Sequence, residues 1–323
     1  MPLLSLLLAL PQHSLADNLQ THVRFLASDE LEGRNTPSPG LDKAAQYIAD
    51  KFKEIGLEPG VGGNSYFQET TFENRTKTIS GKVSNVIGVL RGSDPVLKET
   101  YIIVTGHYDH LGKREGEGDT IFNGANDDAS GVSGVIETAR ALQKAKLKRS
   151  VIFMTFYGEE KGLVGSNYYC KNPVFPLKQT VVNLNLEQIG RTDDDEGPRV
   201  GAFNLTGFDF TDLPRYLEPA AKGAGIKLEK HPRLSDPYFN ASDNAAFARA
   251  GVPSGTVSTA YSFPDYHQVG DHWDKLDYAN MAKVVTAIIA ATQAIANAPE
   301  PIKWVESEKT KRYIEAHKAL IGG

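Results

Sequence analysis

Imidazole and carboxylate side chains recur in this chain just after apolar segments. His107 and Asp109 follow the β-branched and aromatic run 101–104, and acids follow two later apolar runs at 150–156 and 180–186. Imidazole nitrogens and carboxylate oxygens bind zinc, and a neighbouring carboxylate can fix the orientation of a ligating ring. The candidates for such a site are His107, Asp109, Asp127, Glu159, Glu160, Glu187 and His267.

This set of donor groups favours a hydrolytic metal site. Cys170 is the single cysteine, so the chain can form neither an intrachain disulfide nor a thiolate metal site. Donors of the His, Asp and Glu type favour zinc, cobalt or manganese. Two such metals about 3.5–4 Å apart can share a water, lower its pKa and polarise the carbonyl under attack.

The adjacent acids Glu159 and Glu160 suit two different tasks. Neighbouring side chains point in different directions, so one can bind metal while the other moves a proton from the water to the leaving amine. Two exposed glutamates are the alternative interpretation. Asp127 and Asp128 precede a predicted helix, whose N-terminus favours one acid but does not account for two.

Strands and helices alternate along the chain. Apolar and β-branched runs predict strands at 82–90, 101–104, 150–156, 180–186 and 254–258, and helical spacing predicts helices at 17–31, 41–55, 132–145, 213–223, 278–296 and 303–320. The acidic run 193–196 is expected to be a solvated loop. This pattern predicts one α/β domain with a mostly parallel, mixed sheet flanked by helices. Ligand sites of open α/β sheets lie outside the carboxyl ends of the strands, where the candidate residues are found.

Composition and charge narrow the class of protein. The 323 residues are 40% hydrophobic and 23% charged, which is ordinary for a globular protein, and the formal charge is −5. This charge, without any Lys/Arg-rich block, argues against nucleic acid as a partner. The oligomeric state stays open.

The N-terminal residues 2–10 are apolar but too few to span a bilayer. They are typical of the apolar region of a signal peptide, and residues 14–16 offer a small-residue cleavage site, although the usual basic start is missing. An amphipathic first helix is the alternative. We expect a signal peptide or its remnant at 1–16, a peptidase domain at 17–323, and a periplasmic or secreted protein. No other apolar run is expected to be long enough to cross a membrane.

Six ordered motifs together carry a family resemblance. They are GHYDHLG at 106–112, GANDDASG at 124–131, EEKGLVGS at 159–166, NLEQIGR at 185–191, SDNAAFARAGVP at 242–253 and DYHQVGDHWDKLDY at 265–278. The segment VRFLASDELEGR at 23–34 also looks like the start of exported bacterial members. The chain resembles the M28 family of zinc metallopeptidases, the co-catalytic aminopeptidases, without an inserted protease-associated domain.

The resemblance implies a site with two Zn²⁺ ions per chain. His107 looks like a ligand of one zinc, Asp127 like the bridging carboxylate, and Glu160 like the ligand that shares a zinc with His267. Glu159 is similar to the general base, and Asp109 to the residue that holds a ligand in place. Asp128 would be structural rather than a ligand.

Two positions depart from the family pattern. Glu187, a further expected metal ligand, stands where the family usually has Asp, and its extra methylene moves the carboxylate by about one bond. Asn240 and Ala241 replace bulkier or basic residues beside the expected substrate pocket. Tyr238 could supply a phenol to the oxyanion.

The resemblance implies an aminopeptidase acting on peptides with a free N-terminus. A hydroxide held between the two zincs at Asp127 would attack the first peptide carbonyl, and Glu159 would shuttle the proton. The first alternative is a glutaminyl cyclase, an enzyme of the same fold that uses a single zinc. A non-catalytic binding domain is the second, although such relatives generally lose the ligands that this chain keeps.

Overall fold

A computed structural model of the protein describes residues 14–322. Most of the expected export segment 1–16 therefore lies outside the described residues. The first described helix is α1 (Leu15–Leu26), and Ser14 is its N-cap residue. The Ser14 hydroxyl accepts the backbone N–H of Asp17, and the Asp17 carboxylate accepts the backbone N–H of Ser14. The helix therefore starts two residues earlier, and ends earlier, than the spacing predicts. A 3₁₀ helix follows at Asp29–Arg34.

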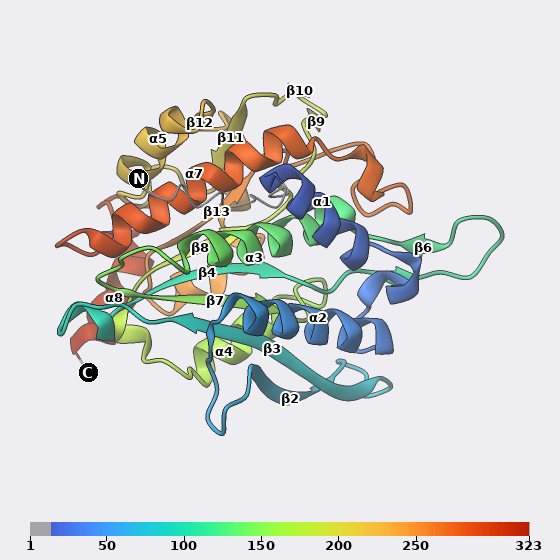
Figure 1. Ribbon diagram of the computed structural model, residues 1–323, viewed down its shortest axis with the longest axis horizontal. Helices are drawn as coiled ribbons and strands as arrows, with labels where there is room; N and C mark the ends of the chain where they lie inside the picture. The colour runs from blue at the N-terminus through green and yellow to red at the C-terminus, as the bar shows by residue number, and fades with distance from the viewer. Residues whose placement is uncertain (1–13, 323) are drawn as a thin grey trace, which may run out of the picture.

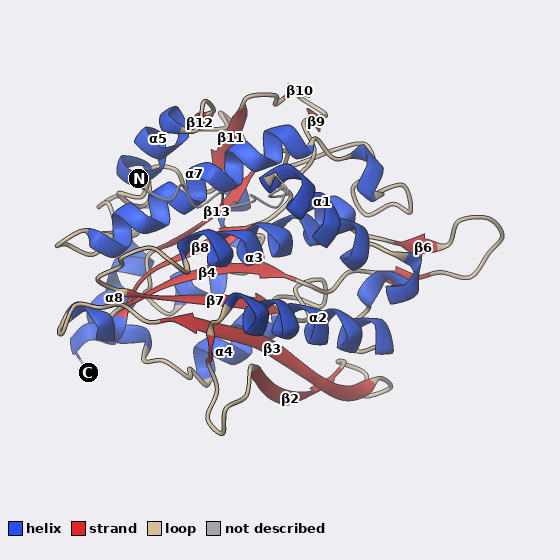
Figure 2. Ribbon diagram, in the orientation of Figure 1, coloured by secondary structure: helices blue, strands red, loops and turns tan. Residues whose placement is uncertain are grey.

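Nine strands of the described chain form one mixed sheet (Figure 2). Strands β7 (Ser150–Phe156), β4 (Tyr101–His107), β8 (Thr180–Leu186) and β13 (Ser254–Ser258) lie side by side and run parallel. Antiparallel strands flank this centre: β3 (Ser80–Leu90) pairs with β7, and β11 (Ala202–Leu205) pairs with β13. The edges are completed by β1 (Glu58–Pro59), β2 (Phe67–Glu73) and β12 (Lys227–Glu229). The predicted α/β class and mixed sheet are confirmed.

Helices cover both faces of the sheet. Figure 1 shows α1, α2 (Pro39–Ile55), α3 (Ser130–Leu142) and α7 (Tyr278–Asn297) in front of the strands, with α5 (Pro214–Gly223) near α7. The other face carries α4 (Val164–Lys171), α6 (Asn244–Arg249) and α8 (Lys311–Gly322). Two short ribbons, β5 (Gly112–Lys113) with β6 (Ile121–Phe122) and β9 (Asp193–Asp194) with β10 (Gly197–Pro198), lie outside the main sheet.

The central strands are buried on both sides, which explains their uninterrupted apolar sequences. Ile102 and Val104 of β4 pack into the larger core beneath α1, α2, α3 and α7. Tyr101 and Ile103 point the opposite way, into the core that contains Phe247 of α6. Because successive side chains of a strand alternate between faces, a run with apolar residues at every position requires cover on both.

Helix α7 corrects one expectation about membrane spans. From the sequence, no segment beyond the N-terminus is expected to be long enough to cross a membrane. The 20 residues of α7 have the length and apolar composition of a membrane-spanning helix. However, 56% of its most apolar window is buried inside the protein. The helix contributes Met281, Val284 and Ile288 to the larger core, as expected for a core helix of an α/β domain.

Two further local predictions are wrong. The last helix begins at Lys311 rather than at residue 303, because residues 303–305 are held by non-local backbone hydrogen bonds such as Val305 N–H to Phe210 O at 2.8 Å. The acidic run 193–196 is only partly solvated. Asp194 is buried because its carboxylate accepts hydrogen bonds from the N–H groups of Tyr261 and Glu196, each at 2.9 Å.

Candidate metal centre

The predicted site residues come from different elements that meet at one edge of the sheet. His107 is the last residue of β4, and Glu187 directly follows β8. Glu159 and Glu160 follow β7 and precede α4. Because these strands are neighbours and run parallel, their carboxyl ends lie together, and all four side chains reach one region.

Asp127 lies between the strands, in a short π-helical turn at Ala125–Ala129 that leads into α3. Its carboxylate is almost completely buried, at 2% exposure. Asp271 holds this turn in place, because its carboxylate accepts the backbone N–H of Asn126 at 3.0 Å and that of Asp127 at 3.1 Å. The turn therefore presents the Asp127 carboxylate toward the strand ends.

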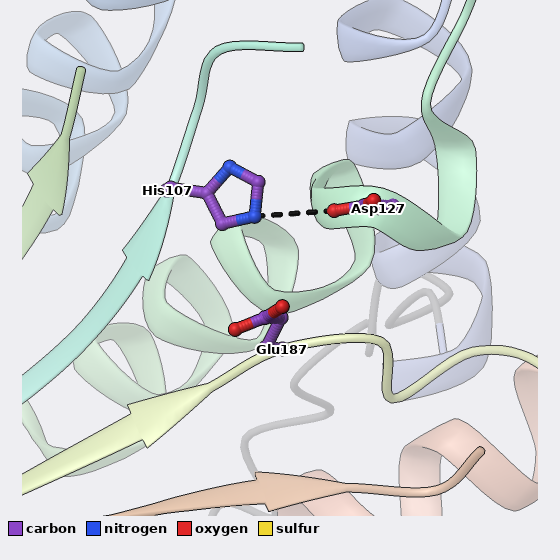
Figure 3. A group of neighbouring side chains, drawn as sticks. All are labelled: His107, Asp127 and Glu187. Carbon is purple, nitrogen blue, oxygen red and sulfur yellow. Dashed lines mark ion pairs between the residues drawn. The ribbon is translucent and has the colours of Figure 1, made fainter. Parts of the chain in front are cut away.

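The first ligand group consists of His107, Asp127 and Glu187 (Figure 3). The Nε2 atom of His107 lies 3.1 Å from Oδ1 of Asp127. One ligand atom from each of the three side chains lies within 4.8 Å of the others. Glu187 therefore reaches the group despite being one methylene longer than the aspartate of the family pattern.

The second ligand group consists of Asp127, Glu160 and His267. The Nε2 atom of His267 is 3.2 Å from Oδ2 of Asp127 and 3.3 Å from Oε1 of Glu160. Asp127 thus offers one carboxylate oxygen to each group. A carboxylate shared in this way is the arrangement that a bridge between two metal ions requires.

These donor groups fit a pair of zinc ions. Within the described chain, His107 Nε2, Glu160 Oε1 and Glu187 Oε2 are buried and make no hydrogen bond of acceptable geometry. Buried polar atoms without partners are rare and call for a specific explanation, such as an ion. The imidazole and carboxylate atoms face one another at about the separations expected for zinc ligands, which bind at about 2.0–2.2 Å.

The electrostatics of the site reflect its excess of buried carboxylates. Burial raises the pKa of Glu187 to about 7, although nearby His107 opposes this shift. Burial would lower the pKa of His107, but its contacts with Asp109 and Asp127 outweigh this effect and raise it well above the usual value. In Glu160 burial raises the pKa, yet the imidazoles lower it on balance to about 2. Metal binding must therefore displace protons from this cluster.

Glu159 stands apart from both ligand groups but lines the same pocket. Burial raises its pKa well above the usual value for a glutamate, and the carboxylates of Glu187 and Asp243 add to the shift. A carboxylate with a raised pKa can hold a proton near neutral pH and release it again, which is what a general acid–base catalyst must do.

Asp109 supports the site without facing a metal position. Its carboxylate accepts the backbone N–H of Glu159 at 3.0 Å and the hydroxyl of Thr36 at 3.1 Å. Its backbone carbonyl lies 3.2 Å from Nδ1 of His107, which leaves the Nε2 atom of that ring for the first ligand group. Asp109 therefore positions both the His107 ring and the Glu159 backbone.

Asp128 ties three elements together. Its carboxylate accepts the backbone N–H groups of His107 at 3.2 Å, Gly131 at 3.0 Å and Gln188 at 3.1 Å. These bonds join the end of β4, the start of α3 and the residue after Glu187. The structure thus places Asp128 in a structural position, outside both ligand groups.

Three residues near the centre escaped the sequence prediction. His110 is fully buried with Nδ1 2.8 Å from Oε1 of Glu160. Asp271 holds the Asp127 turn, and Arg34 donates to the backbone carbonyls of Tyr108, Asn123 and Gly124. All three residues lay inside the quoted segments, where His110 and Asp271 were visible as an imidazole and an acid. Nothing in the local sequence around Arg34 indicates that a buried guanidinium would reach so far along the chain.

A pocket of about 340 Å³ opens beside the two ligand groups. Its wall includes Tyr238, Asn240 and Ala241, the segment where the sequence departs from the family pattern. Among the described residues, the charged side chains that line the pocket are those of the five candidates Asp127, Glu159, Glu160, Glu187 and His267. The other lining residues are uncharged: Gly162, Leu163, Gln188, Thr206, Tyr238, Asn240, Ala241, Ser242, Thr256, Ser258, Tyr261 and Tyr266.

The fold and the paired ligand groups define a class of metallopeptidase, and the sequence identifies the family. Residues 85–292 match the model of peptidase family M28, so the chain belongs to that family. Among similar proteins, a probable zinc metalloprotease of Pyrenophora teres f. teres is 31% identical over 194 residues, 56% of this chain and 40% of that protein. Aminopeptidase YwaD of Bacillus subtilis is 27% identical over 251 residues, 75% of this chain and 52% of that protein. The matched region thus spans about half or less of these relatives.

Solved structures share the fold. BSAP, a zinc aminopeptidase from Bacillus subtilis, superimposes with a TM-score of 0.69 at 16% identity, covering 89% of this chain and 97% of that one. A glutaminyl cyclase of Bacteroides thetaiotaomicron superimposes with a TM-score of 0.64 at 19% identity, covering 87% of this chain and 98% of that one. At these identities the likeness establishes the fold alone.

Proposed function

We propose that the protein is a zinc-dependent aminopeptidase that holds two Zn²⁺ ions. The observation that carries the proposal is the sharing of Asp127 between two ligand groups beside a pocket that is large enough for a side chain. Zinc is the proposed metal because a similar protein is named a probable zinc metalloprotease. When bound, paired zinc ions supply Lewis acidity that lowers the pKa of water and polarises the peptide carbonyl.

The residues of the chain divide the remaining work. His107, Asp127 and Glu187 would hold one zinc, and Glu160 and His267 would hold the other together with Asp127. Glu159 accepts the proton of the attacking water and returns it to the leaving amine, because it lines the pocket and its raised pKa matches both steps. Asp109 fixes the Glu159 backbone during these transfers.

The charge of the pocket favours substrates with a free N-terminal amine. Four carboxylates, those of Asp127, Glu159, Glu160 and Glu187, line it together with one histidine. The two zinc ions would offset Asp127, Glu160 and Glu187, which leaves the carboxylate of Glu159 to attract an ammonium or amine group next to the reacting carbonyl, whereas an acetylated N-terminus carries no such charge. Peptides with a free N-terminus are therefore the proposed substrates.

Hydrolysis of a matched substrate pair tests the proposal. Leu-p-nitroanilide should be cleaved, its N-acetylated form should not, and the activity should vanish on chelation and return with zinc. Equal cleavage of both compounds would remove the preference for the free amine, and failure of zinc to restore activity would remove the metal requirement.

The proton-transfer role of Glu159 has its own test. Glu159→Gln should keep its zinc content and lose at least about 10²-fold in kcat, because removing a general base typically costs about 10²–10⁴-fold. The exposed Glu218 of α5 provides the control, since Glu218→Gln changes one charge far from the pocket. Wild-type turnover in Glu159→Gln would sink this assignment.

Glutaminyl cyclisation is the second candidate, because a cyclase shares the fold. Two complete ligand groups favour the hydrolase over a single-zinc cyclase. Release of ammonia from a peptide with N-terminal Gln, by protein holding one zinc per chain, would support the cyclase instead.

We also propose that residues before the described domain direct export. Expression of the full chain in a bacterium should yield a periplasmic protein that has lost its first residues, as read by N-terminal sequencing. Retention of Met1 in a cytoplasmic product would contradict this.

A further inference from the structure

His110 occupies a place in the metal centre that the family pattern does not assign to it. Its side chain is fully buried, and its Nδ1 atom lies 2.8 Å from Oε1 of Glu160 and 4.0 Å from Oδ2 of Asp127. Asp127 and Glu160 are both members of the second ligand group. The His110 ring also lies near the His267 ring, with 5.8 Å between their centroids.

The contact between His110 and Glu160 is not an ordinary hydrogen bond. Both Nδ1 of His110 and Oε1 of Glu160 are buried, and within the described chain neither has a hydrogen-bond partner of acceptable geometry, although they are 2.8 Å apart. His110, Asp127 and Glu160 each offer one ligand atom, and these three atoms lie within 4.8 Å of one another. This is the arrangement of ligands around an ion.

The distances support a four-cornered site. Four donors bound about 2.0–2.2 Å from a tetrahedral zinc lie about 3.3–3.6 Å from one another. His267 Nε2 lies 3.2 and 3.3 Å from the oxygens of Asp127 and Glu160, and His110 Nδ1 lies 4.0 and 2.8 Å from the same two oxygens. The two His267 separations are close to this value, and the two His110 separations lie on either side of it.

The ring of His110 has little freedom to move away. Its backbone N–H donates to Arg34 O at 3.2 Å, which fixes the start of the side chain. Gly124 packs against the ring so closely that a Cβ atom there would lie 2.5 Å from Cγ of His110. Gly124 also has a φ of +57°, which other residues rarely adopt, so this close approach depends on glycine.

We propose that His110 is the fourth protein ligand of the second zinc position. That position is then closed by Asp127, Glu160, His267 and His110. The first position keeps only three protein ligands and one open coordination site. Closed four-ligand zinc sites are typically structural, and three-ligand sites are typically the ones that bind water and substrate. The open coordination position would then lie on the side of His107 and Glu187.

This inference rests on zinc binding and not on peptide hydrolysis, so it is tested without substrate. Metal-free protein is titrated with zinc by calorimetry against a competing chelator. Wild-type protein should show two sites, and His110→Gln should weaken one of them by at least about 100-fold while leaving the other unchanged, because losing a ligand costs more than the 10–100-fold of an outer-shell change. His317→Gln, on the outer helix α8, is the matched control and should titrate like the wild type.

Two outcomes would overturn the assignment. If His110→Gln binds two zinc ions with wild-type affinities, His110 is not a ligand. If both sites weaken equally, His110 acts through packing and not through a bond to one metal. Absence of peptidase activity in wild-type protein that binds two zinc ions would instead count against the proposed function and leave the assignment of His110 standing.

A variant-independent measurement covers the case in which His110→Gln does not fold. Proton NMR of wild-type protein loaded with cobalt(II) shows one exchangeable, strongly shifted imidazole N–H for each bound histidine. Three such signals are expected, from His107, His267 and His110, whose Nε2 is buried and so protected from exchange. Absence of the exchange-protected His110 signal would refute the proposal.

Discussion

Replacing Arg34 by lysine should weaken the first metal position, although the residue touches neither position. Arg34 is 1% exposed, and its guanidinium donates to Tyr108 O at 2.8 Å, Asn123 O at 2.7 Å, Gly124 O at 3.0 Å and also to Leu26 O. Tyr108 follows His107, and Gly124 precedes the Asp127 turn. One side chain thus joins the two segments that carry ligands of the first group.

The magnitude follows from the geometry of the two side chains. A planar guanidinium donates in several fixed directions, whereas an ammonium is a single point that can serve about two of the four carbonyls. Each buried carbonyl that loses its donor costs about 1–3 kcal/mol. Arg34→Lys should therefore destabilise the fold by about 2–4 kcal/mol, because water or a relaxed carbonyl recovers part of the loss. This is a large share of a total stability of about 5–15 kcal/mol.

Urea unfolding of the chelated protein measures this loss directly. Arg114→Lys, on the exposed loop between β5 and β6, is the control and should stay within about 0.5 kcal/mol of wild type. Zinc titration of the folded Arg34→Lys protein should also show weaker binding at the first ligand group. A change in unfolding free energy below about 0.5 kcal/mol would show that the four hydrogen bonds do not hold the site.

Three further outcomes are expected. Glu187→Asp should lower the zinc affinity of the first position by about 10–100-fold in a chelator competition. The backbone cannot easily move to compensate for the shorter side chain, because Glu187 N–H donates to Val257 O at 3.1 Å. Unchanged zinc affinity would show that the backbone does move. The chelated protein should lose thermal stability as pH rises. Folding raises the pKa of Glu187 from 4.5 to about 7 and the pKa of His267 from 6.5 to about 10. The folded state therefore holds more protons than the unfolded state between these values, and a rise in pH favours unfolding. Zinc-saturated protein should not show this fall, and a chelated protein that melts higher at about pH 8.5 than at about pH 5.5 would contradict the shifts. Among p-nitroanilide substrates, N-terminal Leu or Phe should be preferred over Asp by at least about 10-fold in kcat/KM, because, beyond the groups assigned to zinc, the described residues that line the pocket offer no cation to pair with an aspartate side chain. Equal rates would place the substrate side chain elsewhere.

The central strands were predictable because their sequences leave few alternatives. Runs such as 150–156 and 180–186 are apolar at every position, which suits strands buried on both faces. The last helix and the acidic run 193–196 were not predictable. Residues 303–305 are extended because of hydrogen bonds to residues about 90 positions earlier, and Asp194 is buried by partners about 67 positions later.

The same distinction applies to the metal centre. His107, Asp127, Glu160 and Glu187 could be proposed from donor chemistry at strand ends and from the family motifs, and the structure brings them together. His110 was missed, although it lies three residues from His107, because a second imidazole after a strand has no distinguishing spacing. Only the approach of Glu160 to its ring sets it apart.

The sequence by itself determined which donor groups the site can use and that strands alternate with helices. Donor types, the single cysteine and the alternation of apolar strands with amphipathic helices are local properties, so they can be recognised along the chain. Tertiary structure alone decided which carboxylates pair with which imidazoles, and that Arg34, Asp128 and Asp271 hold the segments between them. The physical reason is that these contacts join residues far apart in sequence, at distances of a few ångströms that the closed fold fixes and no local pattern encodes.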